Sequence, residues 1–161
     1  NAGVGVGAPI ADLDAAEWHR LIDTHLTRDF HCTQAAIPHL LESRGAVVNV
    51  TSCAAHVGQA YTAAYCATKA GLSHLTRSLA MEYMHQPIRF NAVAPGGMMT
   101  ALAGGLRNLQ DADASLVKRY SPLRGVVEIG DVAEMVAFLA SDAASGYHGA
   151  CINIDNGITA G

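Results

Sequence analysis

The sequence has few charged residues and no long hydrophobic run. Only 15% of its 161 residues are charged, and the 10 basic and 14 acidic side chains are scattered along the chain. Because no basic run could bind a phosphate backbone, we expect no nucleic-acid partner. Polar residues or glycines interrupt every apolar stretch well before the roughly 18 residues that a membrane-spanning helix needs, so we expect no membrane span. The 50% hydrophobic content instead predicts one packed globular domain.

Short metal-binding and redox motifs are also missing. The four cysteines, Cys32, Cys53, Cys66 and Cys151, form no CxxC pair, and the eight histidines form no HExxH motif. This spacing favours buried, reduced thiols over disulfides and predicts no metal site, so a metal-dependent hydrolase has no motif behind it. The chain begins at Asn1 without a signal peptide, and we expect a cytoplasmic protein.

The hydrophobic periodicity predicts alternating helices and strands. Helical spacing after an Asp14 N-cap is set by Trp18, Leu21, Ile22, Leu26 and Phe30, and Pro38 should bend or end that helix. The predicted helices cover about 14–41, 63–84 and 131–141, and the predicted strands 46–50, 88–94 and 150–154. A glycine-rich region up to about residue 122 should hold short helices. Strands alternating with helices predict an α/β fold with a buried parallel sheet and helices on both faces.

The glycine loop that opens a nucleotide-binding sheet is not found. Such a sheet needs a first strand followed by glycines that let a pyrophosphate approach a helix N-terminus. Gly3, Gly5 and Gly7 are closely spaced, but no strand precedes them in this sequence, and a flexible terminal loop explains them equally well. We therefore expect the second half only of a Rossmann-like doubly wound sheet, a single partial domain over 1–161.

Three polar residues are predicted to converge at one end of this sheet. Ser52 follows the strand at 46–50, and Tyr65 and Lys69 lie four residues apart on the next helix, so they share one helix face. The carboxyl ends of parallel strands are where ligands bind in open α/β sheets. An exposed tyrosine–lysine pair and a serine that turns the chain form the alternative explanation.

The combination suits the interconversion of an alcohol and a carbonyl. The phenol of a tyrosine has a pKa of about 10, and a nearby ammonium lowers it toward neutrality. We therefore expect Lys69 to lower the pKa of Tyr65, which would act as the acid and base. Ser52 would hold the substrate oxygen by a hydrogen bond.

Several segments resemble motifs of the short-chain dehydrogenase/reductase family, in order and at ordinary spacing. They are NAG at 1–3, NVTS at 49–52, YCATK at 65–69, NAVAPGGMMT at 91–100 and IDNG at 154–157. The resemblance implies a nicotinamide-dependent oxidoreductase of which this chain is the C-terminal catalytic portion. Ser52, Tyr65 and Lys69 would be catalytic, with NAD or NADP as cofactor, because the residue that selects between the two is not in the chain.

The resemblance also implies the cofactor contacts and a fourth catalytic position. The cofactor would be bound by Asn1, Ala2, Gly3, Tyr65, Lys69, Pro95, Gly96, Met98 and Thr100. His25 stands where the family has an asparagine that completes a proton relay through a water to the lysine. A substitute relay through its imidazole and a histidine that only fills a helix kink are both open. Asn156 stands where a glycine is usual.

Two further expectations concern the substrate and the assembly. The segment 97–125, with Met98, Met99, Leu102 and Leu106, would form a lid over a small-molecule alcohol or ketone. The long helices carry Leu72, Leu75 and Leu79 beyond what one sheet face needs, so a homodimer or homotetramer is expected. The alternative function is a non-catalytic truncated fragment that acts only in oligomerisation.

Overall fold

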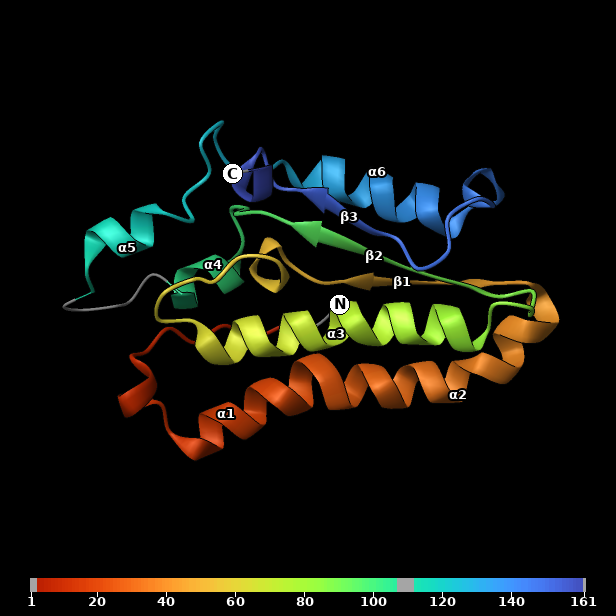
Figure 1. The fold of residues 1–161 in the computed structure, drawn as a ribbon, viewed down its shortest axis with the longest axis horizontal. Helices are drawn as coiled ribbons and strands as arrows, with labels where there is room; N and C mark the ends of the chain where they lie inside the picture. The colour runs from red at the N-terminus through yellow and green to blue at the C-terminus, as the bar shows by residue number, and fades with distance from the viewer. Residues whose placement is uncertain (1–2, 107–111, 161) are drawn as a thin grey trace.

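The computed structural model describes residues 3–106 and 112–160. In this part of the chain, the helices pack around a sheet of three parallel strands. β1 (Ala46–Val50), β2 (Arg89–Pro95) and β3 (Cys151–Ile154) form a sheet with the order β1-β2-β3. The β1 residues pair with 89–93 of β2, and 92–95 of β2 pair with β3. The strands run the same way, so their carboxyl ends meet at one edge, as Figure 1 shows.

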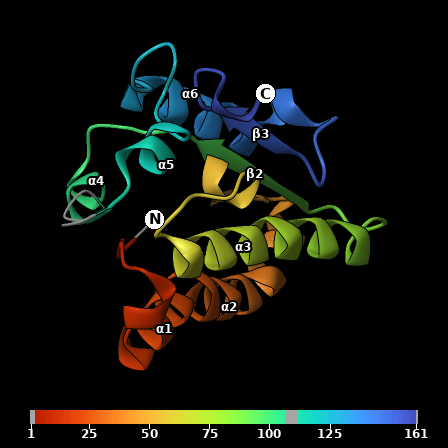
Figure 2. The ribbon, with the colours of Figure 1, turned by 60° about the vertical axis from the view of Figure 1, so that its left-hand side comes forward.

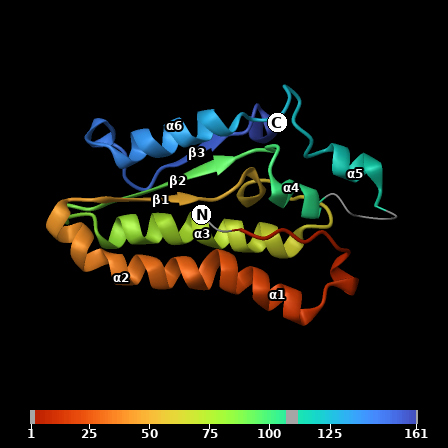
Figure 3. The ribbon, with the colours of Figure 1, turned by 180° about the vertical axis from the view of Figure 1, so that it is seen from behind.

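Helices cover both faces of this sheet. α3 (Ala63–Glu82) connects β1 to β2 on one face, and α6 (Ile129–Ala140) precedes β3 on the other. α1 (Ala15–Ile22) and α2 (Arg28–Ser43) pack outside α3, which therefore lies between them and the sheet (Figures 1 and 2, and Figure 3 from behind). The short helices α4 (Ala101–Leu106) and α5 (Ala114–Lys118) lie beyond the carboxyl ends of the strands. The predicted α/β fold with a parallel sheet is confirmed.

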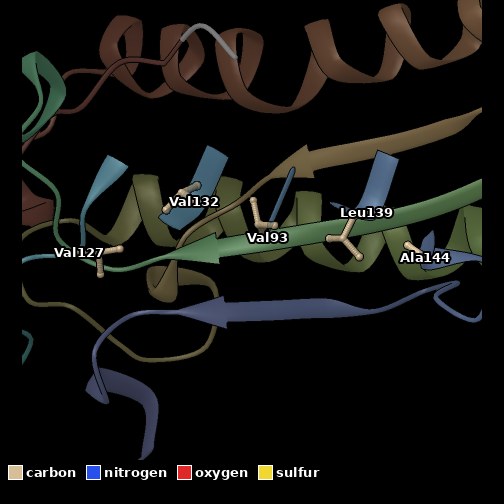
Figure 4. Packing of buried hydrophobic residues seen from close by; sticks show 5 residues of the cluster. All are labelled: Val93, Val127, Val132, Leu139 and Ala144. Carbon is tan, nitrogen blue, oxygen red and sulfur yellow. The ribbon is translucent and has the colours of Figure 1, made fainter. Parts of the chain in front are cut away.

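The core between the sheet and α6 is apolar. Figure 4 shows its central cluster, Val93, Val127, Val132, Leu139 and Ala144, each at most 7% exposed. Burying a valine or leucine side chain contributes about 1.5–3 kcal/mol, so this cluster holds α6 on the sheet. The Arg89 guanidinium adds polar support, because it donates to the carbonyls of Leu139, Ser141 and Ala144 at the end of α6.

The first helical segment is longer and less regular than predicted. The Asp14 carboxylate accepts a hydrogen bond from the Ala16 amide at 2.9 Å, which confirms the N-cap. A π-helical turn, Asp23–Thr27, joins α1 to α2 without a break. Pro38 was expected to bend or end this helix; it lies inside α2, which continues to Ser43, so Pro38 does not end the helix. The helix ends where Arg44 adopts a left-handed φ of 56°.

The other elements differ from prediction by one or two residues at their ends. β1, expected to be buried, is half-buried along its length, because it forms one edge of the described sheet. All four cysteines are free, but only Cys53 is buried and Cys32 is exposed, so the prediction of buried thiols holds for Cys53 alone. Within residues 3–106 and 112–160, no helix is long and apolar enough to cross a membrane.

Candidate active site

Ser52 lies directly beyond β1, where the sheet edge meets α3. Its backbone is extended, and its hydroxyl accepts a hydrogen bond from the Ala54 amide at 3.2 Å, which caps the turn Cys53–Ala55. The preceding residue, Thr51, is 3% exposed and is tied to β2 by two hydrogen bonds to the Val93 carbonyl. The neighbouring strand therefore fixes the position of Ser52.

Tyr65 and Lys69 lie on the first turns of α3, facing the end of β1. Both are buried, with exposed fractions of 6% and 7%. The Lys69 ammonium donates a hydrogen bond to the Val50 carbonyl at 2.9 Å and lies 5.8 Å from the centre of the Tyr65 ring. The last residue of β1 thus anchors the lysine next to the tyrosine, and the two side chains share one helix face, as the spacing predicts.

The acidity of Tyr65 in this structure differs from the expectation. Burial raises the pKa of Tyr65 to about 12, and a hydrogen bond with Ser52 acts in the opposite direction. The sequence led us to expect that Lys69 would lower this pKa. The ammonium instead points to the Val50 carbonyl, and burial of the phenol is the larger effect. This effect of Ser52 shows that its side chain lies close to the phenol of Tyr65.

The pKa of Lys69 is also displaced from its ordinary value. Burial lowers the pKa of Lys69 to about 8, because removal from water disfavours the ammonium. The nearby carboxylate of Asp29 raises this pKa and the guanidinium of Arg28 lowers it, and both effects are smaller than burial. Near neutral pH the lysine is therefore still mostly protonated.

His25 lies in the π-helical turn and is 1% exposed. Its Nε2 is 2.7 Å from the carbonyl oxygen of Val4 and 3.2 Å from the Val4 amide nitrogen. Its ring meets Tyr65 edge to face, with 5.5 Å between the ring centres. Burial lowers the pKa of His25, which favours the neutral imidazole.

The relay expected between His25 and Lys69 would run through a water, and the two side chains make no direct hydrogen bond with each other. The hydrogen bond of Lys69 goes to Val50, and the hydrogen bonds of His25 go to Val4. Within the described residues, Nδ1 of His25 is buried without a hydrogen-bond partner. The histidine therefore joins the N-terminal segment to the helix that carries it, and one ring nitrogen remains available.

The segments expected to bind the cofactor border the same sheet edge. Gly3 is exposed and close to His25, whereas Asn1 and Ala2 lie outside the described residues. Gly96 donates its amide to Ile154, and a Cβ there would be 2.8 Å from the Cα of Asp155, so this position has no room for a side chain.

The other positions of that segment have different surroundings. Pro95 is buried at the end of β2 and Thr100 is half-buried. The Met98 side chain packs against the cluster around Val93. Its backbone carbonyl accepts a hydrogen bond from the Thr100 amide.

Part of the expected lid packs against the tyrosine. Leu102, on α4, belongs to the cluster around Leu21 and Tyr65, together with Val4 and Val6 of the N-terminal segment. Met99 is 65% exposed, and the side chain of Leu106 lies outside the described part of the chain. Leu102 and the N-terminal segment together limit access to Tyr65.

Sequence reasoning missed the groups that position the site. The Val50 and Val4 carbonyls are backbone atoms, and no residue type marks them. Across the described residues, no group of three or more histidine, cysteine or acidic side chains is arranged to hold a metal ion.

Comparisons with known proteins cover the whole chain. The family model described as enoyl-(acyl carrier protein) reductase matches residues 1–159. The cis-4-hydroxycyclohexanecarboxylate dehydrogenase of Sinomonas cyclohexanicum is 44% identical to the chain, over 99% of this chain and 64% of that protein. The 3beta-hydroxysteroid dehydrogenase 1 of Eggerthella lenta is 37% identical, over 99% and 61%.

A solved structure agrees with this match. The 3-ketoacyl-(acyl-carrier-protein) reductase from Brucella melitensis, in complex with NADH, superposes with a TM-score of 0.87 at 26% identity, over 99% of this chain and 65% of that one. The chain thus spans less than two thirds of the length of each of these relatives.

Proposed function

Because the chain belongs to the short-chain dehydrogenase/reductase family, we propose that it is the catalytic part of an NAD- or NADP-dependent oxidoreductase that interconverts an alcohol and a carbonyl. One observation carries this proposal. Ser52, Tyr65 and Lys69 converge at the carboxyl end of β1, with Lys69 anchored on Val50 and the Ser52 side chain close enough to Tyr65 to act on its pKa. An exposed, unrelated tyrosine–lysine pair would show none of this burial.

Each residue has a distinct role in the proposed reaction. Tyr65 gives a proton to the carbonyl oxygen during reduction and takes it back during oxidation. Ser52 holds that oxygen by a hydrogen bond. The Lys69 ammonium, 5.8 Å from the centre of the Tyr65 ring, would stabilise the phenolate by turning from Val50 toward it, because burial raises the pKa of Tyr65 to about 12 in the present arrangement.

The residues present fit the nicotinamide end of the cofactor. When bound, NAD or NADP accepts or supplies the hydride. Lys69 uses one of its three donors on Val50 in the described structure, so donors remain for a hydroxyl group of the cofactor. Gly3, Pro95, Gly96, the Met98 backbone and Thr100 would hold the cofactor along the sheet edge, with Asn1 and Ala2 as further proposed contacts.

The relatives suggest a substrate class. The names of the two relatives at 44% and 37% identity specify a hydroxycyclohexanecarboxylate and a 3beta-hydroxysteroid. Both are secondary alcohols on a saturated six-membered ring. Leu102, which packs against the cluster that contains Tyr65, would offer an apolar surface to such a ring. We propose a cyclic secondary alcohol and its ketone as the substrate pair.

A second copy of the chain is the proposed partner. An open groove between the first helical segment and α3 is lined by Leu26, Phe30, Gly71, His74, Leu75 and Ser78. Leu72 is 1% exposed and Leu79 packs against the Ala80 cluster, so of the three leucines expected at an interface only Leu75 lines this groove. Sedimentation of the full-length protein as a monomer would count against a dimer.

The decisive experiment replaces Tyr65 in the full-length protein. Tyr65→Phe should lower turnover of cis-4-hydroxycyclohexanecarboxylate with NAD or NADP by about a thousandfold, because general acid–base catalysis contributes 10²–10⁴. Cofactor affinity should stay within about twofold, since the ring remains. The control is Tyr83→Phe, at the far end of α3, where the ring packs on Phe90. Turnover of the Tyr65→Phe protein within about threefold of the parent rejects Tyr65 as the acid. If the parent turns over no alcohol with NAD or NADP, the oxidoreductase proposal fails and the non-catalytic alternative, a role in oligomerisation only, is favoured.

A further inference from the structure

Two tyrosines connect α5 to the loop that leads into α3. The Tyr61 hydroxyl accepts a hydrogen bond from the Asp113 amide at 3.0 Å, at the N-terminal end of α5. The Tyr120 hydroxyl donates to the Ala60 carbonyl at 3.2 Å, beyond the C-terminal end of α5. The two bonds run in opposite directions and fix both ends of α5 to two adjacent residues of the loop.

Tyr61 holds this contact in an unusual backbone conformation. Its φ is 66°, in the left-handed region that bulky residues rarely adopt. Glycine would take this φ without strain, but it has no hydroxyl that could reach Asp113. The Tyr61 carbonyl also accepts the Ala8 amide at 2.8 Å. One strained residue therefore joins the N-terminal segment, the loop before α3 and the α5 segment.

These contacts lead directly to the tyrosine of the proposed active site. Tyr61 precedes Tyr65 by one helical turn, and the next residue, Thr62, is 3% exposed and fixed to the Gln59 carbonyl through its hydroxyl. Val6, two residues before the Ala8 contact, packs in the cluster that contains Tyr65. A shift of α5 would therefore change the packing around Tyr65, through Tyr61 and the N-terminal segment.

We propose that Tyr61 is a positioning residue that holds α5 against the loop before Tyr65 and thereby sets the space available to the body of the substrate. This inference rests on the proposed oxidoreductase function and deepens it, because it names a residue that controls substrate fit without touching the reacting atoms. Tyr120 acts from the opposite end of α5 in the same way.

The first test measures the contact without any catalysis. In the full-length protein, Tyr61→Phe removes one oxygen and keeps the ring, so amide hydrogen exchange over 113–120 should become about fivefold faster, as expected for one lost hydrogen bond. Tyr120→Phe should accelerate exchange over the same segment. The control, Tyr83→Phe, alters a ring that packs on Phe90 and should leave this segment unchanged. Unchanged exchange over 113–120 in Tyr61→Phe overturns the proposal.

The second test asks whether the contact matters to substrate. With cis-4-hydroxycyclohexanecarboxylate as the probe, Tyr61→Phe should raise KM for the alcohol about fivefold and leave kcat and the cofactor KM within about twofold. Tyr61→Gly should show the same KM increase even though it removes the backbone strain. Faster exchange with an unchanged KM for the alcohol refutes the positioning role. If the parent protein turns over no alcohol, the proposed function fails and the substrate part of this inference fails with it, while exchange still decides the contact.

Discussion

The two ends of α3 each meet a histidine that hydrogen-bonds to backbone, but the two histidines are not equally satisfied. At the C-terminal end, His148 donates from Nε2 to the Ala80 carbonyl at 2.6 Å, and its Nδ1 accepts the Phe90 amide at 3.4 Å. At the N-terminal end, His25 places Nε2 between the two backbone groups of Val4 and leaves Nδ1 without a partner among the described residues.

The surroundings of the two ends differ in the same way. The C-terminal end packs Ala80, Ile88 and Phe90 into an apolar cluster. The N-terminal end buries Tyr65 and Lys69, two polar groups whose pKa values are both displaced by burial. Buried polar groups with displaced pKa values cost stability and gather at functional sites. One end of the helix therefore stabilises the fold, and the other has the properties of a reaction site.

The largest expected effect is at the stabilising end. His148→Ala removes the partners of two buried backbone groups, so the free energy of unfolding should fall by about 2–3 kcal/mol. Chemical denaturation of the full-length protein measures this loss. The control is His39→Ala, which truncates an exposed histidine of α2 and should change the free energy by less than about 0.5 kcal/mol. Equal losses in both variants would remove the distinction between the two ends.

The stabilising end is also where prediction from sequence succeeded. Alternating runs of apolar residues gave β2 and α3 to within two residues, because their periodicity reflects which side chains enter the core. The pairing of Tyr65 with Lys69 followed from helix spacing alone. Residue types do not reveal which backbone carbonyl an ammonium will choose, so the Val50 contact and the raised pKa of Tyr65 were not foreseen.

A second group of errors has a geometric origin. Pro38 was expected to bend or end its helix, and it does not end it, because proline removes only one backbone amide donor and α2 continues to Ser43. The π-helical turn that contains His25 has no signal in the sequence. A π-helical turn holds one residue more than an α-helical turn, and no residue type marks where that residue is inserted. The role of Tyr61 has no signal in the sequence either, because no glycine or asparagine marks its left-handed backbone.

An effect of intermediate size is expected at Lys69, as a pH dependence of the free energy of unfolding. The pKa of Lys69 is about 8 in the folded chain, below its ordinary value of 10.5, so the folded state binds fewer protons between these values. Its contribution to stability is therefore present above pH 10.5 and is lost as pH falls through about 8. Relative to Lys69→Met, the parent should gain on the order of 2 kcal/mol between about pH 8 and about pH 10.

The same measurement has a clear control and a limit. Lys118→Met replaces an exposed lysine of α5 and should show no such pH dependence relative to the parent. Above pH 10 the raised pKa of Tyr65 acts with the opposite sign, because the folded state keeps a proton that the unfolded state loses. If the difference in the free energy of unfolding between the parent and Lys69→Met stays constant from about pH 7 to about pH 10, burial does not lower the pKa of Lys69.

The smallest expected effect concerns His25 and follows from the geometry at Val4. One ring nitrogen lies within hydrogen-bonding distance of both the Val4 amide and the Val4 carbonyl, and it can satisfy only one of them at a time. The shorter distance, 2.7 Å, favours donation to the carbonyl, which leaves Nδ1 as an unprotonated acceptor. Glutamine has a similar reach and supplies both a donor and an acceptor. At about pH 7.5, His25→Gln should therefore change the free energy of unfolding by less than about 1 kcal/mol.

The pH dependence then separates the two residues. Burial lowers the pKa of His25 in the folded state, so the stability that the neutral ring contributes is present above its ordinary pKa of 6.5 and is lost as pH falls through the folded value. Glutamine does not titrate, and the other histidines are common to both proteins. The parent should therefore lose stability relative to His25→Gln between about pH 7.5 and about pH 5, as measured by denaturation at the two values. If the difference between the two proteins is the same at both pH values, His25 is not a buried neutral imidazole, and the contrast between the two ends of α3 rests on Tyr65 and Lys69 alone.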